Sequence, residues 1–277
     1  MAYEYKLIDV QIAGKVATAT ISNPPVNVIT LPLLAELEAL SHELKHDPDP
    51  LVVVFKSADP DFFLAHFDVT AILDRPTNHP ARRDPQVKAF HAICERYRTM
   101  DKVMIAQIEG RVGGGGSELS ASFDMRFGVR GKTKINQMEV PLGILPGGTG
   151  TQRLPRLLGK GRAMEVILGG DDLDAETAER WGYLNRIYEA DQIGPAVEKL
   201  ARRIASFPPE AVRLAKESVN QSDRPLMEGL AEEAYLFDQT LRTDGAKRNM
   251  AKFMEIGGQT REGELRMGDL CRELGEG

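Results

Sequence analysis

Four glycines followed closely by a glutamate form the segment whose residue types and spacing most clearly indicate a binding or catalytic site. Gly113 to Gly116 come after an apolar run at residues 103–108 and directly before Ser117 and Glu118. Glycines allow a backbone to approach a ligand closely and to take positive φ angles. A helix that opens at these glycines would point free N–H groups and its positive end at a ligand. The arrangement suits a phosphate or a developing oxyanion, and a tight strand-to-helix turn without a ligand is the alternative interpretation.

A second carboxylate, Glu139, follows Glu118 after a predicted strand at residues 124–129, a turn at Gly131 and Lys132, and another extended run. That out-and-back path can return Glu139 to the neighbourhood of Glu118. Two carboxyl groups that face one cavity are suited to general acid and base catalysis on a single water molecule. Like charges close together in a dry site should raise the pKa of at least one of them. The alternative for either residue is a charge on the protein surface.

The elements that must position these carboxylates alternate between strands and helices over the N-terminal two thirds of the chain. Strands are predicted at residues 6–12, 16–21, 51–55 and 103–108. Thr30 is expected to cap a helix that contains Pro32 and runs to about Lys45. Residues 69–100 are helix-prone, and this alternation implies parallel strands joined by crossovers. No dinucleotide fingerprint follows any strand, so a nicotinamide cofactor is not expected.

The C-terminal third, from about Gly159, is predicted to be almost wholly helical. We expect helices at residues 159–167, from Asp174 to Gly182, from about Pro208, at residues 226–241, and from a cap at Asp244. Their apolar faces predict contacts with the core or with another subunit. The last stretch, residues 257–277, is polar and Gly-rich, and we expect it to be mobile or to dock on a neighbouring subunit.

The composition excludes several classes of function. The chain has 277 residues, with 35 Lys and Arg against 41 Asp and Glu, which gives a formal net charge of -6 at pH 7. That charge argues against nucleic acid or an anionic membrane as the main partner. No apolar run approaches the roughly 20 residues of a membrane span, and the five His show no metal-ligand spacing. We therefore expect no metal site. The two cysteines form no disulfide framework and the N-terminus shows no signal-peptide pattern, so we expect a cytoplasmic protein.

The chain resembles the crotonase superfamily, and within it the enoyl-CoA hydratases. The resemblance covers about residues 5 to 255 and depends on a combination of motifs, because no single one is specific. The matching segments are residues 114–119, Asp124, and residues 137–139, 142–147, 150–156, 159–160, 163–165 and 215–220. This resemblance implies an α/β fold, with a crotonase-like spiral of ββα units at residues 1–200 as the CoA-binding core. Residues 201–277 would form a C-terminal helical region for trimerisation.

The resemblance also implies roles for individual residues. Glu118 and Glu139 occupy the positions of two glutamates that hold one water molecule in hydratases. Glu118 would help to deprotonate that water for attack on the β-carbon, and Glu139 would deliver a proton to the α-carbon. The backbone N–H groups of Phe67 and Gly115 would hold the thioester oxygen in an oxyanion hole. Further substrate contacts are expected at Ala65, His66, Asp68, Gly114, Leu142 and Gly143.

The implied substrate is an acyl-CoA thioester, with no cofactor beyond its coenzyme A, and the implied assembly is a homotrimer or a dimer of trimers. The presence of both glutamates favours addition of water to an enoyl-CoA. One alternative is another crotonase-type CoA enzyme, such as an isomerase, a thioester hydrolase or a decarboxylase. Residues 69–100 keep that alternative open, because this stretch normally builds the acyl pocket and here contains Arg75, Arg82 and Arg83. The other alternative is a non-catalytic scaffold of the same fold.

Overall fold

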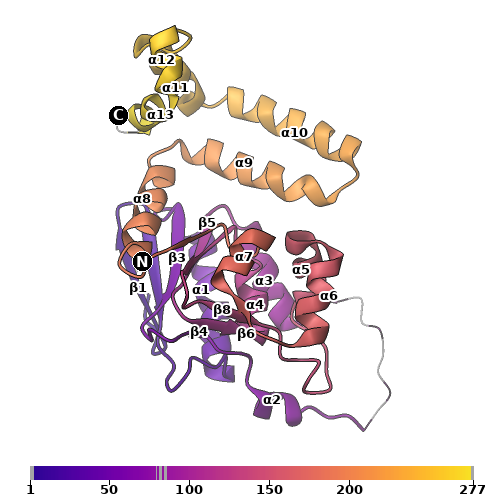
Figure 1. Cartoon of the computed structure of the whole chain (residues 1–277). Helices are drawn as coiled ribbons and strands as arrows, with labels where there is room; N and C mark the ends of the chain where they lie inside the picture. Colours follow the sequence, from indigo (N-terminus) through magenta and orange to yellow (C-terminus); the bar gives the residue numbers. More distant parts are fainter. Residues whose placement is uncertain (1–2, 79, 81–82, 84–85, 276–277) are drawn as a thin grey trace.

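A computed structural model describes residues 3–78, 80, 83 and 86–275 of the chain. Two β-sheets and the helices that cover them form the main body, and a group of helices stands away from it at the C-terminal end (Figure 1). Arg82, named above with Arg75 and Arg83, lies outside the described residues.

The larger sheet has six strands in the order β1-β2-β3-β5-β7-β10. Their bounds are β1 Ile8–Ala13, β2 Val16–Ile21, β3 Val52–Ser57, β5 Val103–Ile108, β7 Met125–Val129 and β10 Arg186–Tyr188. β1 and β2 form an antiparallel hairpin, and the other neighbouring strands are parallel, which confirms the predicted strands and their parallel arrangement. The expectation of an almost wholly helical C-terminal third is wrong at β10 and at one further strand, Leu173–Asp174. Both strands are too short to show an alternating apolar pattern.

The smaller sheet has four strands in the order β4-β6-β8-β9. Their bounds are β4 Phe62–Leu64, β6 Arg111–Gly113, β8 Lys134–Asn136 and β9 Leu173–Asp174. A strand of the larger sheet is followed by one of the smaller sheet three times, as β3-β4, β5-β6 and β7-β8, and one or more helices follow each pair. This repetition is the ββα unit that the resemblance implied.

Helices whose ends have side-chain signals were predicted most accurately. α1 spans Leu31–His46, and the Thr30 side chain accepts a hydrogen bond from the Leu33 N–H, as expected for its cap. α7 spans Ala175–Trp181 between the cap Asp174 and Gly182, which adopts a φ of 92°. A side-chain acceptor before a helix, and a glycine with positive φ after it, are local features that the sequence displays directly.

The remaining helices of the main body include two that the sequence did not predict separately. Their bounds are α2 Val69–Leu73, α3 Ala89–Thr99, α4 Gly114–Ser120, α5 Gly150–Leu158, α6 Lys160–Gly169 and α8 Ile193–Ala205. α5 and α8 are the unpredicted ones. α8 packs on the larger sheet through Ile193, Val197, Ala201 and Ala205, so the separate helical region begins after α8.

The C-terminal region consists of α9 Pro209–Asn220, a short 3-10 turn, α10 Leu226–Leu241, α11 Asp244–Glu255, α12 Arg261–Leu265 and α13 Met267–Gly275. α9 lies nearest the sheets, and α10 lies beyond it (Figure 1). The predicted cap at Asp244 is wrong, because Thr243 Oγ1 accepts the hydrogen bond from the Ala246 N–H at 3.2 Å.

The segment expected to be mobile or to dock on a neighbouring subunit forms the short helices α12 and α13, of which α13 contacts α11 of the same chain. The α11 residue Lys252 donates from Nζ to the Glu273 carbonyl of α13 at 2.6 Å. Leu270 of α13 is fully buried. Polar and glycine residues outnumber apolar ones here, which hides the short amphipathic helices from a periodicity argument.

The described residues contain neither a membrane-spanning helix nor a metal-binding cluster. Within them, no helix has the length and apolar character needed to cross a membrane. The same part of the chain has no group of three or more His, Cys, Asp or Glu side chains placed to hold a metal ion.

Candidate active site

A cavity of about 280 Å³ is lined by residues from the start of α4, from α2 and from the start of α3. It brings together six of the predicted site residues: His66, Phe67, Gly115, Glu118, Glu139 and Leu142. Its other lining residues are Val69, Ile72, Arg75, Phe90, Met138, Ile144, Leu145, Gly147 and Gly148. The lining is therefore mainly apolar, with two carboxylates at the base of the cavity.

Glu118 is held by the N-terminal end of α5. Its side chain comes from α4 and the residue is only 4% exposed. The Oε1 atom accepts hydrogen bonds from the backbone N–H groups of Gly148, Thr149 and Gly150, at 2.8, 2.8 and 2.7 Å. Three N–H donors and the positive end of a helix stabilise a negative charge at this oxygen. The second oxygen, Oε2, takes part in none of these three bonds.

Glu139 differs from Glu118 in the surroundings of its carboxylate. It is 8% exposed, and its Oε2 atom is buried without a hydrogen-bond partner among the described residues. Burial, and after it the charge of Glu118, raises the pKa of Glu139 to about 7. This agrees with the expectation that one of two neighbouring carboxylates would hold its proton more tightly.

The backbones of Phe67 and Gly115 are adjacent at the cavity. Ile29 donates to the His66 carbonyl at 2.8 Å and accepts from the Asp68 N–H at 3.1 Å. In such a parallel bridge the N–H of the middle residue, Phe67, points away from Ile29. The Gly115 N–H belongs to the first turn of α4, where no intrahelical acceptor exists. A Cβ on Gly115 would lie 3.4 Å from the Phe67 nitrogen, so the two backbones are in contact.

The glycine run is explained by close approach. Gly114 has a φ of 43°, which favours glycine. A Cβ on Gly116 would come within 2.4 Å of the Leu64 carbonyl oxygen, so a larger residue would push α4 away from β4. The predicted role of the glycines in bringing backbone N–H groups to a site therefore has a geometric basis.

A second cavity, of about 270 Å³, adjoins the first and shares His66 and Met138 with it. The predicted residue Ala65 lines this cavity, together with the cations Arg111 and Lys134. The Arg111 guanidinium is already paired with Asp172 Oδ2, at 2.8 and 2.6 Å.

Three predicted substrate contacts do not line either cavity. Asp68 instead caps α2, because its Oδ1 accepts from the Thr70 N–H at 2.9 Å. Gly143 occupies a turn with a φ of 81°. Gly114 lies next to the site, where an added Cβ would be 3.0 Å from Glu139 Oε1. Their positions were inferred from motif alignment alone, which does not show whether a residue faces a ligand or supports one that does.

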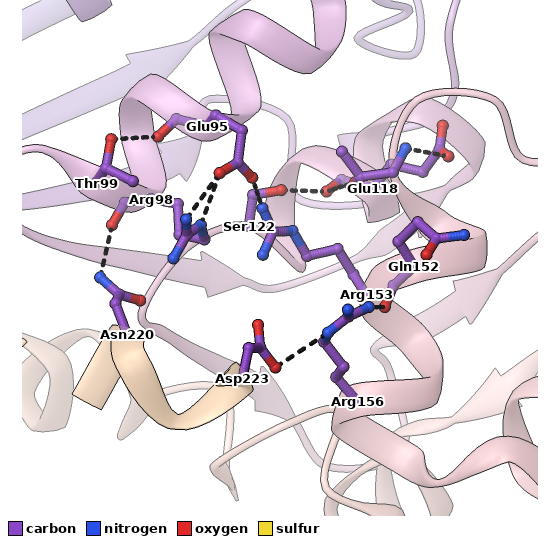
Figure 2. A network of polar contacts seen from close by, with 11 residues as sticks. Glu95, Arg98, Thr99, Glu118, Ser122, Gln152, Arg153, Arg156, Asn220 and Asp223 are labelled. Carbon is purple, nitrogen blue, oxygen red and sulfur yellow. Dashed lines mark hydrogen bonds and ion pairs between the residues drawn. The ribbon is translucent and has the colours of Figure 1, made fainter. Parts of the chain in front are cut away.

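A polar network that includes residues of α3 and α5 was not predicted (Figure 2). Glu95 of α3 forms an ion pair with Arg153 of α5 and a second one with Arg98, at 2.8 Å. Arg156 of α5 pairs with Asp223 at 3.0 Å. These contacts anchor the helix whose first N–H groups hold Glu118. No sequence signal links Glu95 to Arg153, because the two residues are 58 positions apart.

Solved structures identify the class of protein that this fold and site define. The enoyl-CoA hydratase of Bacillus anthracis superposes with a TM-score of 0.83 at 28% identity, covering 90% of this chain and 96% of that one. The fold is thus the crotonase fold that the resemblance implied.

Sequence comparisons define the family. Residues 11–261 match the sequence profile of the family Enoyl-CoA hydratase/isomerase. The short-chain-enoyl-CoA hydratase of Clostridium acetobutylicum is 30% identical, over 87% of this chain and 92% of that protein. The crotonyl-CoA hydratase of Syntrophomonas wolfei is 31% identical, over 92% of this chain and 96% of that protein. The chain belongs to the enoyl-CoA hydratase/isomerase family and is an enoyl-CoA hydratase-like enzyme.

Proposed function

We propose that the protein catalyses the reversible addition of water across the α,β double bond of an enoyl-CoA thioester. The observation that carries this proposal is the unequal pair of carboxylates in one cavity. Three N–H groups stabilise the charged form of Glu118, whereas the pKa of Glu139 is raised to about 7. Two carboxyl groups with such different surroundings are equipped to act as a base and an acid.

The first step is attack by water on the β-carbon. The N–H groups of Phe67 and Gly115 hold the thioester oxygen and make the β-carbon electrophilic. Glu118 accepts a proton from the water through Oε2, because Oε1 is occupied by the three N–H donors. The water oxygen bonds to the β-carbon, and the electrons of the double bond move toward the thioester oxygen as an enolate.

The second step returns a proton to the α-carbon. Glu139, protonated because of its burial, donates its proton there, and the thioester carbonyl re-forms. The product is a 3-hydroxyacyl-CoA, and the proton on Glu118 passes to Glu139 to restore the starting state. The same groups in reverse order dehydrate the product. These steps use no cofactor other than the coenzyme A of the substrate.

The two adjoining cavities divide the substrate between them. The acyl group occupies the cavity that contains the two glutamates, against Leu142 and the other apolar residues. The coenzyme A arm occupies the second cavity, past Ala65 and His66. Asp68, Gly114 and Gly143 act indirectly, by supporting the backbone beside Phe67, beside Gly115 and in the loop after Glu139. The names of the relatives support a CoA thioester as substrate.

We also propose that the protein assembles as a homotrimer or as a dimer of trimers. The α10 side chains Leu226, Met227, Tyr235 and Phe237 are between 60% and 75% exposed, and Leu236 is the one buried residue of that helix. An apolar surface of this kind is normally covered by another subunit. Light scattering of the purified protein measures the mass directly, and a monomer at micromolar concentration would contradict the assembly.

The test of the reaction is a screen of enoyl-CoA thioesters of different chain lengths, followed through the loss of the conjugated enoyl-thioester absorbance. We expect hydration of at least one short-chain substrate. If the protein hydrates none of them but moves a β,γ double bond or cleaves the thioester, the proposed reaction is wrong. Failure to bind any CoA ester would favour a non-catalytic role.

A further inference from the structure

The acyl cavity has one permanent positive charge among its described lining residues. Arg75 lies just beyond α2, where its N–H donates to the Ile72 carbonyl at 3.2 Å. Its guanidinium forms no hydrogen bond or ion pair with any residue in the described part of the chain. By contrast, the arginine of the adjoining cavity, Arg111, is already paired with Asp172. Arg75 therefore has five donors available to a ligand.

The position of Arg75 places it on the acyl side of the site. His66 and Met138 are the residues that both cavities share, so they mark the junction at which the thioester must lie. Arg75 lines only the cavity with the glutamates. An acyl chain that extends away from the thioester in this cavity meets apolar side chains such as Ile72 and Phe90. Arg75 follows Ile72 closely in the chain and lines the same cavity.

The two glutamates do not neutralise this guanidinium. No ion pair within 4.0 Å joins Arg75 to Glu118 or Glu139, and Glu118 Oε1 is already fully engaged with backbone donors. A methyl group at the end of an acyl chain would gain nothing from a guanidinium. A carboxylate would form a charge-assisted, two-point hydrogen bond with it.

We propose that Arg75 binds a carboxylate at the far end of the acyl chain, so that the preferred substrates are enoyl-CoA thioesters of dicarboxylic acids. This inference rests on the proposed function, because it assigns the acyl group to the cavity with the glutamates. The phosphates of coenzyme A are the other source of an anion. We favour the acyl carboxylate, because the second cavity has its own cation, Lys134, in addition to the paired Arg111, and Arg75 does not line it.

Binding of non-reacting thioesters tests this without depending on catalysis. Calorimetry would compare each saturated dicarboxylic mono-CoA thioester of five to eight carbons, such as adipyl-CoA, with the monocarboxylic ester of the same length, such as hexanoyl-CoA. For at least one length, we expect the wild type to bind the dicarboxylic ester about tenfold more tightly. Arg75→Leu should remove that preference, and Arg75→Lys should keep part of it.

Arg83→Leu is the matched control, because Arg83 belongs to the same segment but lines neither cavity. It should retain the preference of the wild type. If the wild type shows no preference at any length, the proposal is wrong. If Arg75→Leu weakens binding of both kinds of ester equally, Arg75 binds coenzyme A phosphate and the proposal is also wrong.

Turnover separates this proposal from the proposed function. The substrates are 2-hexenedioyl-CoA and 2-hexenoyl-CoA, with the other lengths treated in the same way. Hydration of both at equal kcat/KM would overturn the role of Arg75 and leave the hydratase intact. Selective binding of dicarboxylic esters without hydration of any ester would support the role of Arg75 and overturn the proposed hydratase function.

Discussion

Glu118 and Arg75 line one cavity but belong to two regions that are built in different ways. Every residue of α4, which carries Glu118, is buried, and the N-terminal end of α5 holds its carboxylate. By contrast, α2, which also lines the cavity, has no buried residue, and Leu73 is 77% exposed. We call the α4 and α5 side the base of the cavity, and α2 with Arg75 the outer wall.

The comparison indicates that the two regions have different functions. Side chains in the base are positioned by many simultaneous contacts, so a small change there moves groups that act on the reacting atoms. Side chains in the outer wall are held by few contacts, so they can vary at little cost to folding. We therefore expect substitutions in the base to affect kcat, and those in the outer wall to affect which acyl chain is bound.

The largest effects should come from the two carboxylates. Glu118→Gln and Glu139→Gln should each lower kcat by about 10²–10⁴-fold with little change in KM, because each removes proton transfer in the transition state. The double variant should lose little more than the worse single variant, because the pair acts as a unit. Steady-state kinetics measures this, with Glu165→Gln on the exposed face of α6 as control. Full activity in either single variant would disprove the assigned roles.

A smaller but still severe loss is expected from one added methyl group in the base. A Cβ on Gly148 would lie 2.4 Å from Glu118 Oε2 and 2.5 Å from a ring carbon of Phe90. Gly148→Ala should therefore displace the carboxylate and lower kcat by about a hundredfold, while circular dichroism shows an intact fold. At the neighbouring Gly147 the nearest atom is 3.6 Å away, so Gly147→Ala should be much milder. Equal losses in both variants would mean that the loop, not the carboxylate, is responsible.

The pH dependence should report the protonation of Glu139. Because the acid form of Glu139 donates the proton and its pKa is about 7, kcat/KM for hydration should fall about tenfold per pH unit above that value. Glu118→Gln removes a negative charge that raises this pKa, so the residual activity should begin to fall at a lower pH. A pH profile that stays flat up to pH 9 would contradict Glu139 as the proton donor.

The ion pairs that hold α5 should affect kcat less than the residues of the base do. Arg153→Met would leave Glu95 with Arg98 alone and loosen α5, so we expect kcat to fall about three- to tenfold. The free energy of unfolding should fall by about 1–2 kcal/mol, because Arg153 is largely buried but Glu95 is half-exposed. Arg156→Met removes an exposed ion pair of the same helix and should change neither quantity measurably. Thermal unfolding and kinetics of the two variants provide the comparison.

The smallest effects are expected in the outer part of the cavity. Leu145 lines the cavity but is 63% exposed, so Leu145→Ala should change the stability by no more than about 0.5 kcal/mol. Its kcat for a short substrate should be unchanged, whereas KM for longer acyl chains should rise a few-fold as apolar contact is lost. A large loss of kcat here would contradict the expectation that exposed lining residues affect only which acyl chain is bound.

Local signals in the sequence were sufficient for much of the fold. The cap at Thr30, the end of α7 at Gly182 and the apolar period of α10 all depend on residues within one or two helical turns, and the structure confirms them. Elements without such signals were missed, as with β10 and α8, or misjudged, as with the segment that folds into α13. Their stability comes from packing on distant parts of the chain, which no short window displays.

For the site, too, some features were predictable from the sequence and others depended on the tertiary structure. The sequence alone determined which residues could do the chemistry, because glycines after a strand and two separated glutamates are visible as residue types. The tertiary structure decided how the surroundings of the two glutamates differ. That difference comes from three N–H groups some 30 residues from Glu118, and from the burial of Glu139 beside it. Protonation depends on the desolvation and charges that folding brings together, so the same two residues in an unfolded chain would be equivalent.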